Sequence, residues 1–483
     1  MTQTATRTLE IYPVTRIEGH GKVTLHLNEH GKVENATFAV TQFRGFERFA
    51  QGRPFTEMPS LTARTCGICP VSHLIAASKA CDDIMAVAIP DAAKNLRRIV
   101  NLAQLMQSHA LAFFYLSSPD LLLGMDSDPA ARNLFGVLSE NPNLARDGIS
   151  LRKFGQSIIE QLGGKRIHPS WIVPGGVASP MTLETRTFIL DGVGPAKAAV
   201  LRSLEWYKQA VDPLGDGPFS AEAASFGNFE SLFMGMVDEN GNLEHYDGLL
   251  RMIDAHGAIV EDGFDVHEYG VKLAERVEPF SYLKSPYYQP LGYPGGMYRV
   301  GPLARLNIAR ACGTPMADRE LEFFRQLANG PVLGSFHYHH ARLIEILYAL
   351  ERIEELAADP VTGSRRVRAE AGPNRSSGIG AAEAPRGTLI HEYAVDENGL
   401  VTSANMIIAT GHNNLALNES VKQVAQRFVD GSHIQEGMLN RVEAVVRAYD
   451  PCLSCSTHAV GKMPLRVTLL DASGAILDEA TRG

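Results

Sequence analysis

Four of the six cysteines form two C-x-x-C pairs, Cys66/Cys69 and Cys452/Cys455, near opposite ends of the 483-residue chain. Cysteines three positions apart lie on one side of a helical turn, so the two thiolates of a pair can converge on one metal ion. Thiolates are soft ligands that favour nickel, iron, copper(I) or zinc over magnesium or calcium. Cys69 also precedes an expected helix N-terminus, where the helix dipole favours the ligating thiolate by lowering its pKa. The pairs therefore predict a metal site.

Two kinds of metal site fit this pattern. One is a structural zinc ion with four cysteine ligands, a common meaning of two C-x-x-C pairs. Zinc ribbons place their pairs about 15–20 residues apart, whereas 382 residues separate Cys69 from Cys452. A site that joins both ends of a chain suits a deeply placed cofactor better than a local staple. A redox disulfide within a pair lacks the thioredoxin-like context, and the lone Cys81 and Cys312 are expected to be buried as small apolar residues.

The helices that must position these cysteines are predicted from hydrophobic spacing and capping residues. Ser72 is the expected N-cap of a helix over 72–87, directly after the first pair. Apolar residues at helical spacing predict a long helix over 92–117, suited to the interior of a bundle. Further helices are expected over 142–162, 318–329, 335–358, 417–430 and 434–448.

Three hairpins are expected as well, with turns at 28–31, 396–399 and 473–474. Residues 165–335 are rich in Gly, Pro and aromatic residues and show no clear pattern. The whole predicts an α-dominated α+β fold, with a large helical-bundle core and small peripheral β-sheets, in one intertwined domain rather than three separate ones.

Composition narrows the function classes. Lys and Arg number 45 against 54 Asp and Glu, which gives a net charge of −9 without basic runs, so the chain is a poor nucleic-acid binder. No apolar stretch of about 18 residues predicts a transmembrane helix, and the N-terminal residues lack a signal-peptide pattern. We therefore expect a cytoplasmic protein without direct membrane insertion. Walker and dinucleotide fingerprints are missing.

Five blocks of sequence carry a resemblance to a known family. They are PVTRIEGH (13–20), FRGFE (43–47), RTCGICPVSH (64–73), EAPRG (383–387) and DPCLSCSTH (450–458). In identity and order they resemble the large subunit of [NiFe] hydrogenases, and most closely the catalytic subunit of the soluble, bidirectional NAD-linked hydrogenases. The resemblance runs from about residue 10 to the C-terminus.

The resemblance implies a nickel–iron centre held by the four cysteines. Cys66 and Cys452 would be terminal nickel ligands, and Cys69 and Cys455 would bridge nickel to an iron that carries carbon monoxide and two cyanides. The implied chemistry is the reversible splitting of dihydrogen into a proton and a hydride. A basic group must take the proton within hydrogen-bond reach, and the candidates are the Cys452 thiolate and Arg386.

Glu18 is the implied proton relay, because in the family this glutamate hydrogen-bonds the terminal thiolate of the second pair. A carboxylate beside a buried cluster can exchange protons if burial raises its pKa. Outside the motif set, Glu18 would more simply pair with Arg16 or His20 at a surface, since Glu is rarely buried.

Arg386 would donate hydrogen bonds to a cyanide near the open coordination position, since its guanidinium offers five donors and keeps its proton. Pro385 and Leu389 would help to keep that pocket dry. Asp450 would hold Arg386 in place, although an Asp before Pro451 is also a common turn former.

Two further residues would tune the centre. Thr410 aligns with a hydroxyl residue that hydrogen-bonds the other cyanide. His73, four residues after Cys69, would donate to that bridging sulfur and adjust its basicity; otherwise it is an ordinary histidine in the first turn of a helix.

Glu47 and His458 would hold a separate hydrated ion, magnesium or iron. Carboxylates and water suit magnesium, whereas an imidazole ligand is less usual for it, so the metal stays open. One position departs from many membrane-bound relatives, which have an aspartate where this chain has Ser108, before His109. Because serine has no carboxyl group, no acidic role of that aspartate can be carried over to Ser108.

The cluster His337, His339 and His340 matches no metal motif of the family. We expect it at a helix surface or an interface.

Family members are made as precursors, which a dedicated maturation protease cuts after nickel insertion. Here the cut would follow His458, so that 1–458 is the single catalytic domain and 459–483 a C-terminal propeptide. The propeptide hairpin would keep Cys452 and Cys455 accessible until the metal is loaded.

Electrons must leave through partners, because no cysteines remain for iron–sulfur clusters. The resemblance implies a small subunit with a [4Fe–4S] cluster and diaphorase subunits that carry FMN and iron–sulfur clusters and reduce NAD. One alternative is a hydrogenase large subunit that passes electrons to NADP or to a membrane electron-transport chain. A second is a non-catalytic relative such as the quinone-site subunit of respiratory complex I, but that subunit lacks the four cysteines. A third is a zinc-stabilised interaction protein.

Overall fold

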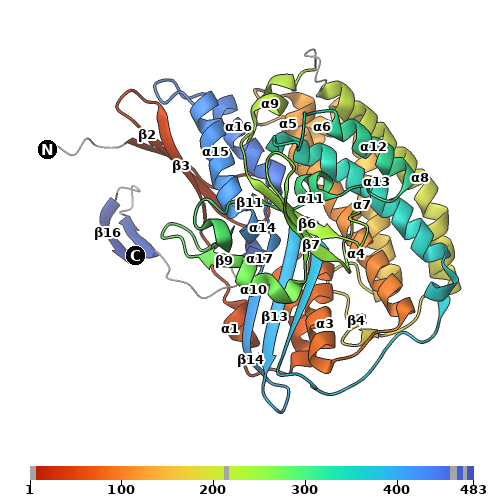
Figure 1. Cartoon of the computed structure of the whole chain (residues 1–483). Helices are drawn as coiled ribbons and strands as arrows, with labels where there is room; N and C mark the ends of the chain where they lie inside the picture. The colour runs from red at the N-terminus through yellow and green to blue at the C-terminus, as the bar shows by residue number, and fades with distance from the viewer. Residues whose placement is uncertain (1–6, 212–216, 457–464, 471–475, 483) are drawn as a thin grey trace.

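Four long helices form the centre of the molecule (Figure 1): α4 (Asp91–Leu111), α7 (Pro142–Gly163), α8 (Leu183–Ala210) and α13 (Tyr338–Ala358). In the computed structural model α4 and α8 each pack against both α7 and α13. The residues that the structure describes are 7–211, 217–456, 465–470 and 476–482. The expected helical-bundle core with small peripheral sheets is confirmed.

The bundle forms because its helices carry apolar residues on every turn that faces a neighbour. On α4 one stripe is completely buried, made of Leu96, Ile99, Ala103, Met106 and Ala110. The long helix predicted over 92–117 is interrupted after Leu111, since Ala112–Ser117 forms a π-helical turn. A π-bulge of this kind shifts the register of the side chains that follow it.

The first C-x-x-C pair leads into α3 (Pro70–Met85), which packs on an antiparallel sheet. That sheet has the order β12 (Ser377–Ala384), β13 (Gly387–Val395) and β14 (Val401–Ile407). The predicted β13–β14 hairpin is present, and β12 adds a third strand that the sequence did not indicate. Because Ala384 pairs with Gly387, Pro385 and Arg386 form a tight two-residue turn at one end of the sheet.

Two helices from the last part of the chain, α15 (Asn414–Phe428) and α16 (Glu436–Tyr449), pack together. An N-terminal antiparallel sheet covers α15 with its third strand (Figure 1). Its strands are β1 (Arg7–Ile11), β2 (Gly21–Leu27) and β3 (Val33–Val40). The predicted hairpin between β2 and β3 is confirmed. Alternate residues of β2 are buried, as expected for a strand with one face on the core.

The region without a clear pattern contains α8 and a four-stranded sheet of order β11–β6–β7–β8. These strands are β6 (Leu232–Val237), β7 (Leu249–Ile253), β8 (Ile259–Phe264) and β11 (Tyr298–Arg299). β6 is buried at every position, so it shows no alternation. α8 contains Pro195, a residue that normally argues against a helix interior.

Shorter elements complete the described chain. They are α1 (Phe46–Ala50), α2 (Met58–Thr62), α5 (Ser118–Leu123), α6 (Leu134–Glu140), α9 (Ser220–Ser225), α10 (Tyr269–Lys272), α11 (Pro302–Ile308), α12 (Pro315–Arg325), α14 (Ala409–His412), α17 (Leu453–Ser456), β4 (Ile172–Val173), β5 (Gly176–Val177), β9 (Leu273–Arg276), β10 (Ser285–Tyr288), β15 (Leu465–Leu470) and β16 (Ile476–Arg482). β15 and β16 pair as the predicted C-terminal hairpin, whose expected turn at 473–474 lies outside the described residues. Among the described helices, none is both long and apolar enough to cross a membrane.

Two local predictions were wrong. α3 begins at Pro70 with Cys69 as its N-cap, so Ser72 is a buried residue inside the helix and not its cap. His337, His339 and His340, expected at a surface or interface, are buried at 9, 3 and 1% exposure. The rings of His339 and His340 pack among aromatic side chains, because the start of α13 lies inside the bundle. The lone Cys81 and Cys312 are buried, as predicted.

Candidate metal centre

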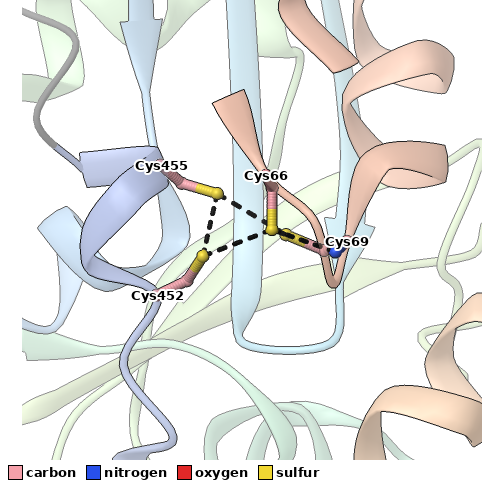
Figure 2. Close-up of side chains that lie close together, drawn as sticks. All are labelled: Cys66, Cys69, Cys452 and Cys455. Atoms are coloured by element: carbon pink, nitrogen blue, oxygen red, sulfur yellow. Dashed lines mark hydrogen bonds between the residues drawn. The ribbon is translucent and has the colours of Figure 1, made fainter. Parts of the chain in front are cut away.

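The four cysteines of the two pairs meet in one buried cluster (Figure 2). Their sulfur atoms all lie within 4.8 Å of one another. Around the cluster, Cys66 lies 2.9 Å from Cys69, Cys69 3.6 Å from Cys455, Cys455 2.9 Å from Cys452, and Cys452 3.4 Å from Cys66. The first cysteine of each pair thus faces the first of the other, and the second faces the second. Four soft donors that converge in this way can hold one or two thiophilic metal ions.

The loop of the first pair is held by hydrogen bonds from both sides. The backbone N–H groups of Ile68 and Cys69 donate to the Cys66 sulfur at 3.2 and 3.0 Å. Two side chains of α4, Gln104 and Gln107, donate to the Ile68 carbonyl oxygen at 2.6 and 2.9 Å. The loop is therefore fixed to the central bundle before any metal binds.

The second pair is positioned by the N-terminal RIEG segment. Glu18 and Cys452 form a parallel β-bridge, and the Leu453 N–H donates to the Glu18 carbonyl oxygen at 3.2 Å. Gly19 has φ +86°, and a Cβ there would lie 2.7 Å from Cβ of Leu453. Only glycine allows this approach, because it lacks a Cβ and accepts positive φ. Thr410 adds a further contact, since its hydroxyl oxygen accepts the Cys452 N–H at 2.9 Å.

The four thiols do not ionise equally. Burial opposes ionisation of Cys66, but hydrogen bonds from the other three thiols and the charge of Arg386 bring its pKa well below the ordinary value. Burial raises the pKa of Cys452 and of Cys455. Hydrogen bonds from Cys452 and Cys455 lower the pKa of Cys69, yet its bond to Cys66, burial and the charge of Cys66 raise it overall. The predicted lowering of the Cys69 pKa by the helix dipole is therefore outweighed. Metal binding must displace protons from those thiols whose pKa is raised.

Arg386 lies over the cluster at the β12–β13 turn. Its Nε donates to the Asp450 carbonyl oxygen, and Nη2 lies 3.1 Å from Oδ1 of Asp450. Burial acts against its charge, but Asp450 and the Cys452, Cys69 and Cys66 thiolates raise its pKa well above the ordinary value. Nη1 is buried without a hydrogen-bond partner among the described residues. An orphaned donor of a permanent cation beside four thiols fits a bound group that accepts hydrogen bonds.

Comparison with known proteins decides the family. The family model described as nickel-dependent hydrogenase matches residues 44–131 and 224–458, and a model described as HoxL-like matches 8–43. The chain belongs to the nickel-dependent hydrogenase family. Within it, this is a [NiFe] hydrogenase large subunit with the four-cysteine nickel–iron site. A zinc-stabilised interaction protein is thereby set aside.

Several relatives of this hydrogenase subunit share its full length. The beta subunit of the NAD-reducing hydrogenase HoxS from Cupriavidus necator is 42% identical, in an alignment that covers 99% of this chain and 100% of that protein. An F420-non-reducing hydrogenase subunit of the vhc type, from Methanococcus voltae, is 40% identical, over 94% of this chain and 96% of that protein.

Solved structures agree with these relatives. A crystal structure of an NAD+-reducing [NiFe]-hydrogenase in the H2-reduced state has a TM-score of 0.90 at 42% identity, over 94% of this chain and 100% of that one. A [NiFeSe] hydrogenase from Desulfovibrio vulgaris, at 23% identity, shares the fold with a TM-score of 0.75.

The hydrogenase subunit places Glu18 and His73 next to the second pair. Both carboxylate oxygens of Glu18 accept hydrogen bonds from Ser454, one from its N–H at 3.0 Å and one from its hydroxyl. These bonds hold the carboxylate on the Cys452–Cys455 turn. Nε2 of His73 lies 3.4 Å from the Cys455 sulfur, whereas the resemblance implies a bond to Cys69.

Pro385 and Leu389 are buried, as is the rest of the turn around Arg386. Leu389 belongs to an apolar cluster that includes the four cysteines, Ala76, Ala384, Met406 and Ile408. The centre therefore lies in a dry pocket in which charge–charge interactions are strong.

Glu47 lies on α1 and accepts a 2.8 Å hydrogen bond from the Met406 N–H. Its expected co-ligand His458 lies outside the described residues. Ser108 is buried, and its hydroxyl oxygen has no hydrogen-bond partner among the described residues. Its neighbour His109 lies 2.8 Å from a carboxylate oxygen of Glu345.

Sequence reasoning missed a buried ionic network behind Arg386. Arg305 on α11 binds Glu345 through Nε and Nη2, both at 2.6 Å, and Glu383 through Nη1 at 2.7 Å. It also donates to the carbonyl oxygens of Ala384 and Pro385 at 3.0 and 3.3 Å. All three ionic side chains are fully buried. The network fixes the turn that carries Arg386, and nothing local in the sequence indicates it.

Proposed function

We propose that this hydrogenase subunit catalyses the reversible, heterolytic cleavage of dihydrogen and that its electrons pass through partner subunits to NAD+. The observation that carries the chemistry is the cluster of four thiols beneath the orphaned Nη1 of Arg386. When bound, a nickel–iron centre supplies the Lewis-acid and redox chemistry that polarises dihydrogen and accepts its electrons.

Each cysteine has a defined place in this proposal. Cys66 and Cys452 would be ligands of nickel only, and Cys69 and Cys455 would be shared between nickel and an iron that carries carbon monoxide and two cyanides. The facing order of the sulfurs supports the assignment, because it puts the two proposed terminal ligands together and the two proposed bridges together. Arg386 would donate to one cyanide from Nη1, and Thr410 would donate to the other, since its hydroxyl accepts from the Cys452 N–H and so keeps its own proton available.

Protons leave the site through the Cys452 thiolate and Glu18. The thiolate takes the proton first, whereas Arg386, the other predicted candidate, keeps its own proton because its neighbours hold its pKa well above the ordinary value. Support comes from the position of the carboxylate on the turn between Cys452 and Cys455, where Ser454 holds both of its oxygens. A fixed carboxylate close to the acceptor lowers the barrier for proton transfer.

Electrons leave through partners because the chain keeps no spare cysteines in reach of the centre. Of its six cysteines, four build the cluster, and Cys81 and Cys312 lie apart and buried. We propose a small subunit with a [4Fe–4S] cluster next to this chain, followed by diaphorase subunits with FMN and iron–sulfur clusters. The full-length similarity to the NAD-reducing relative supports this acceptor.

A different acceptor is the second candidate, because the F420-non-reducing archaeal relative is nearly as similar, at 40% identity. A cytoplasmic location stays a prediction that cell fractionation would test.

A separate magnesium or iron ion is proposed between Glu47 and His458. Glu47 accepts a hydrogen bond from the Met406 N–H, and Met406 belongs to the apolar cluster that contains the four cysteines. This contact supports an ion site close to the metal centre. Metal analysis of a Glu47→Gln variant tests it, with loss of one magnesium or iron per chain as the expected result.

Maturation by a protease is proposed after His458, which leaves 1–458 as the catalytic domain. The family model ends at residue 458, and the NAD+-reducing crystal structure is fully covered by 94% of this chain. Both facts support removal of 459–483. Mass spectrometry of the active complex would overturn this proposal if it found an intact C-terminus.

The experiment for the function itself is spectroscopic and enzymatic. The purified complex is assayed for nickel and iron, and its infrared spectrum is recorded for bands of iron-bound carbon monoxide and cyanide. Zinc at one per chain without such bands would end the hydrogenase proposal. Hydrogen-dependent reduction of NAD+, compared with NADP+ and with a quinone analogue, then identifies the acceptor.

A further inference from the structure

A line of hydrogen-bonding side chains runs from the Cys455 sulfur into the protein. Nε2 of His73 lies 3.4 Å from that sulfur, and Nδ1 of His73 lies 3.2 Å from Nε2 of His391. Nδ1 of His391 lies 2.6 Å from the Tyr393 hydroxyl oxygen. All three side chains are buried, with exposures of 1% or less. Each imidazole is thus contacted at both of its nitrogens.

The fold sets this line through two elements. His73 is on α3, whose N-cap is Cys69, and α3 packs against β13. His391 and Tyr393 are both on β13 and are two residues apart, so they lie on the same face of the strand. The rings of His73 and His391 are 5.3 Å apart and tilted by 56°. Helix–sheet packing therefore builds the line without any contribution from the metal.

We propose that Tyr393 and His391 are positioning residues that fix the tautomer of His73, so that its Nε2–H always donates to the Cys455 thiolate. This inference rests on the proposed function, because it treats Cys455 as a metal-bound thiolate, which accepts hydrogen bonds and cannot donate them.

The direction of each bond follows from that end point. A neutral His73 that donates from Nε2 must accept at Nδ1, so Nε2 of His391 carries the proton between the two rings. Nδ1 of His391 is then an acceptor, and Tyr393 must donate to it. The line has one consistent orientation, and this orientation needs a donor at its far end, which the phenol of Tyr393 supplies.

Tyr393 is suited to this role because it stays protonated. Burial raises its pKa well above the ordinary value, and the nearby Cys81 and Glu47 add to this, against an opposing hydrogen bond from Thr62. A phenol that cannot ionise is a permanent donor. Metal-bound histidines and thiolates are commonly oriented by such outer partners.

The expected consequence is electronic. A donated N–H withdraws electron density from the thiolate sulfur, so the bridged iron has less density to give back to its carbon monoxide. Loss of the donor should lower the carbon monoxide stretching frequency. His73→Phe, which removes the donor, defines the full size of this shift.

The test records infrared spectra of the assembled complex, with nickel and iron contents measured for every variant. Tyr393→Phe removes only the hydroxyl. We expect its carbon monoxide band to move in the same direction as in His73→Phe, by part of the full shift, or to split into two positions as both tautomers become populated. Tyr207→Phe is the matched control, because Tyr207 is buried on α8 and its hydroxyl donates to a backbone carbonyl oxygen, that of Phe336, at 3.4 Å.

A second pair of variants tests the same point at His391. Glutamine offers an amide donor to Nδ1 of His73 without needing Tyr393, whereas leucine has similar bulk and no donor. His391→Gln should keep the wild-type band, and Tyr393→Phe added to it should cause no further shift. His391→Leu should move the band towards the His73→Phe position or split it, as both tautomers become populated.

Two outcomes would overturn the inference. One is a wild-type band in Tyr393→Phe while His73→Phe is shifted. The other is equal shifts in His391→Gln and His391→Leu. Failure of the proposed function is distinguishable, because the wild-type complex would then lack the carbon monoxide and cyanide bands altogether.

Discussion

The carboxylate of Glu18 accepts a 3.0 Å hydrogen bond from the backbone N–H of Ser454, 436 residues further along the chain. This bond ties the N-terminal segment to the turn between Cys452 and Cys455. It also puts this carboxylate, the proposed proton carrier, next to a proposed nickel ligand. Structural and catalytic roles of Glu18 can be separated, because glutamine keeps one of the two oxygens that accept from Ser454 but cannot carry a proton.

Glu18→Gln should therefore retain nickel and iron and lose turnover. General acid–base groups contribute about 10²–10⁴-fold in rate, so we expect a fall of at least about 10²-fold in hydrogen oxidation and in H2/D2O exchange. Glu10→Gln is the control, since Glu10 is on β1 and pairs with Lys22 at the surface. Full exchange activity in Glu18→Gln would remove Glu18 from the proton path.

Gly19→Ala should loosen the second cysteine pair. The new Cβ would lie 2.7 Å from Cβ of Leu453 at a φ of +86°, and strain of this kind costs about 1–3 kcal/mol. We expect a lower thermal midpoint and a reduced nickel content. Gly270→Ala, within α10 and with open space around the site of the Cβ, should instead stabilise by up to about 0.5–1 kcal/mol. Equal effects of the two variants would contradict the close-approach argument.

Local sequence patterns predicted some elements and site residues correctly and missed others. Repeating patterns predicted the β2–β3 and β13–β14 hairpins and most of α4, because turn glycines and apolar spacing act locally. Cys66 and Cys452 were grouped through their motifs, since ligand spacing survives in the sequence. β6 was missed because a strand buried on both faces has no alternation.

Other features could not be read because they depend on pairing in three dimensions. Arg305, Glu345 and Glu383 come from three elements, and only the fold brings them together. His339 and His340 looked polar enough for a surface, yet the ring of Phe336 packs against His339 and that of Tyr207 on α8 packs against His340. The sulfur that His73 contacts is that of Cys455. This contact depends on where the Cys452/Cys455 pair packs against α3, which the sequence does not show.

Glu345→Gln should destabilise the subunit strongly. Removal of one charge from a buried, hydrogen-bonded ion pair leaves the other charge uncompensated, at a cost of about 3–5 kcal/mol. Because Arg305 also holds the carbonyl oxygens of Ala384 and Pro385, the turn that carries Arg386 should lose order as well. Urea unfolding measures the first effect, and the cyanide infrared bands measure the second.

Glu354→Gln is the matched control for Glu345→Gln on the same helix. Glu354 is half exposed and pairs with Lys197, and surface pairs contribute only about 0–1 kcal/mol. A Glu345→Gln protein as stable as Glu354→Gln would show that the buried network is dispensable.

Acid should destabilise the subunit through its buried histidines. Burial lowers the pKa of His337 to about 4, and burial together with the charge of His337 and Lys208 lowers that of His340 to about 3. In the unfolded chain a histidine titrates near pH 6.5. Between these values the unfolded state binds more protons, so stability is complete above about pH 6.5 and falls as the pH drops towards 4.

The slope of this loss should be about 1.4 kcal/mol per pH unit for each such histidine. His340→Gln removes one titrating group while it keeps a polar side chain of similar size. We expect the free energy of unfolding of this variant, measured in urea from pH 7 to 4.5, to fall less steeply than that of wild type by about that amount per pH unit. Groups common to both proteins, including the cysteine thiols, cancel in the difference. Parallel curves for the two proteins would show that His340 does not contribute to acid sensitivity.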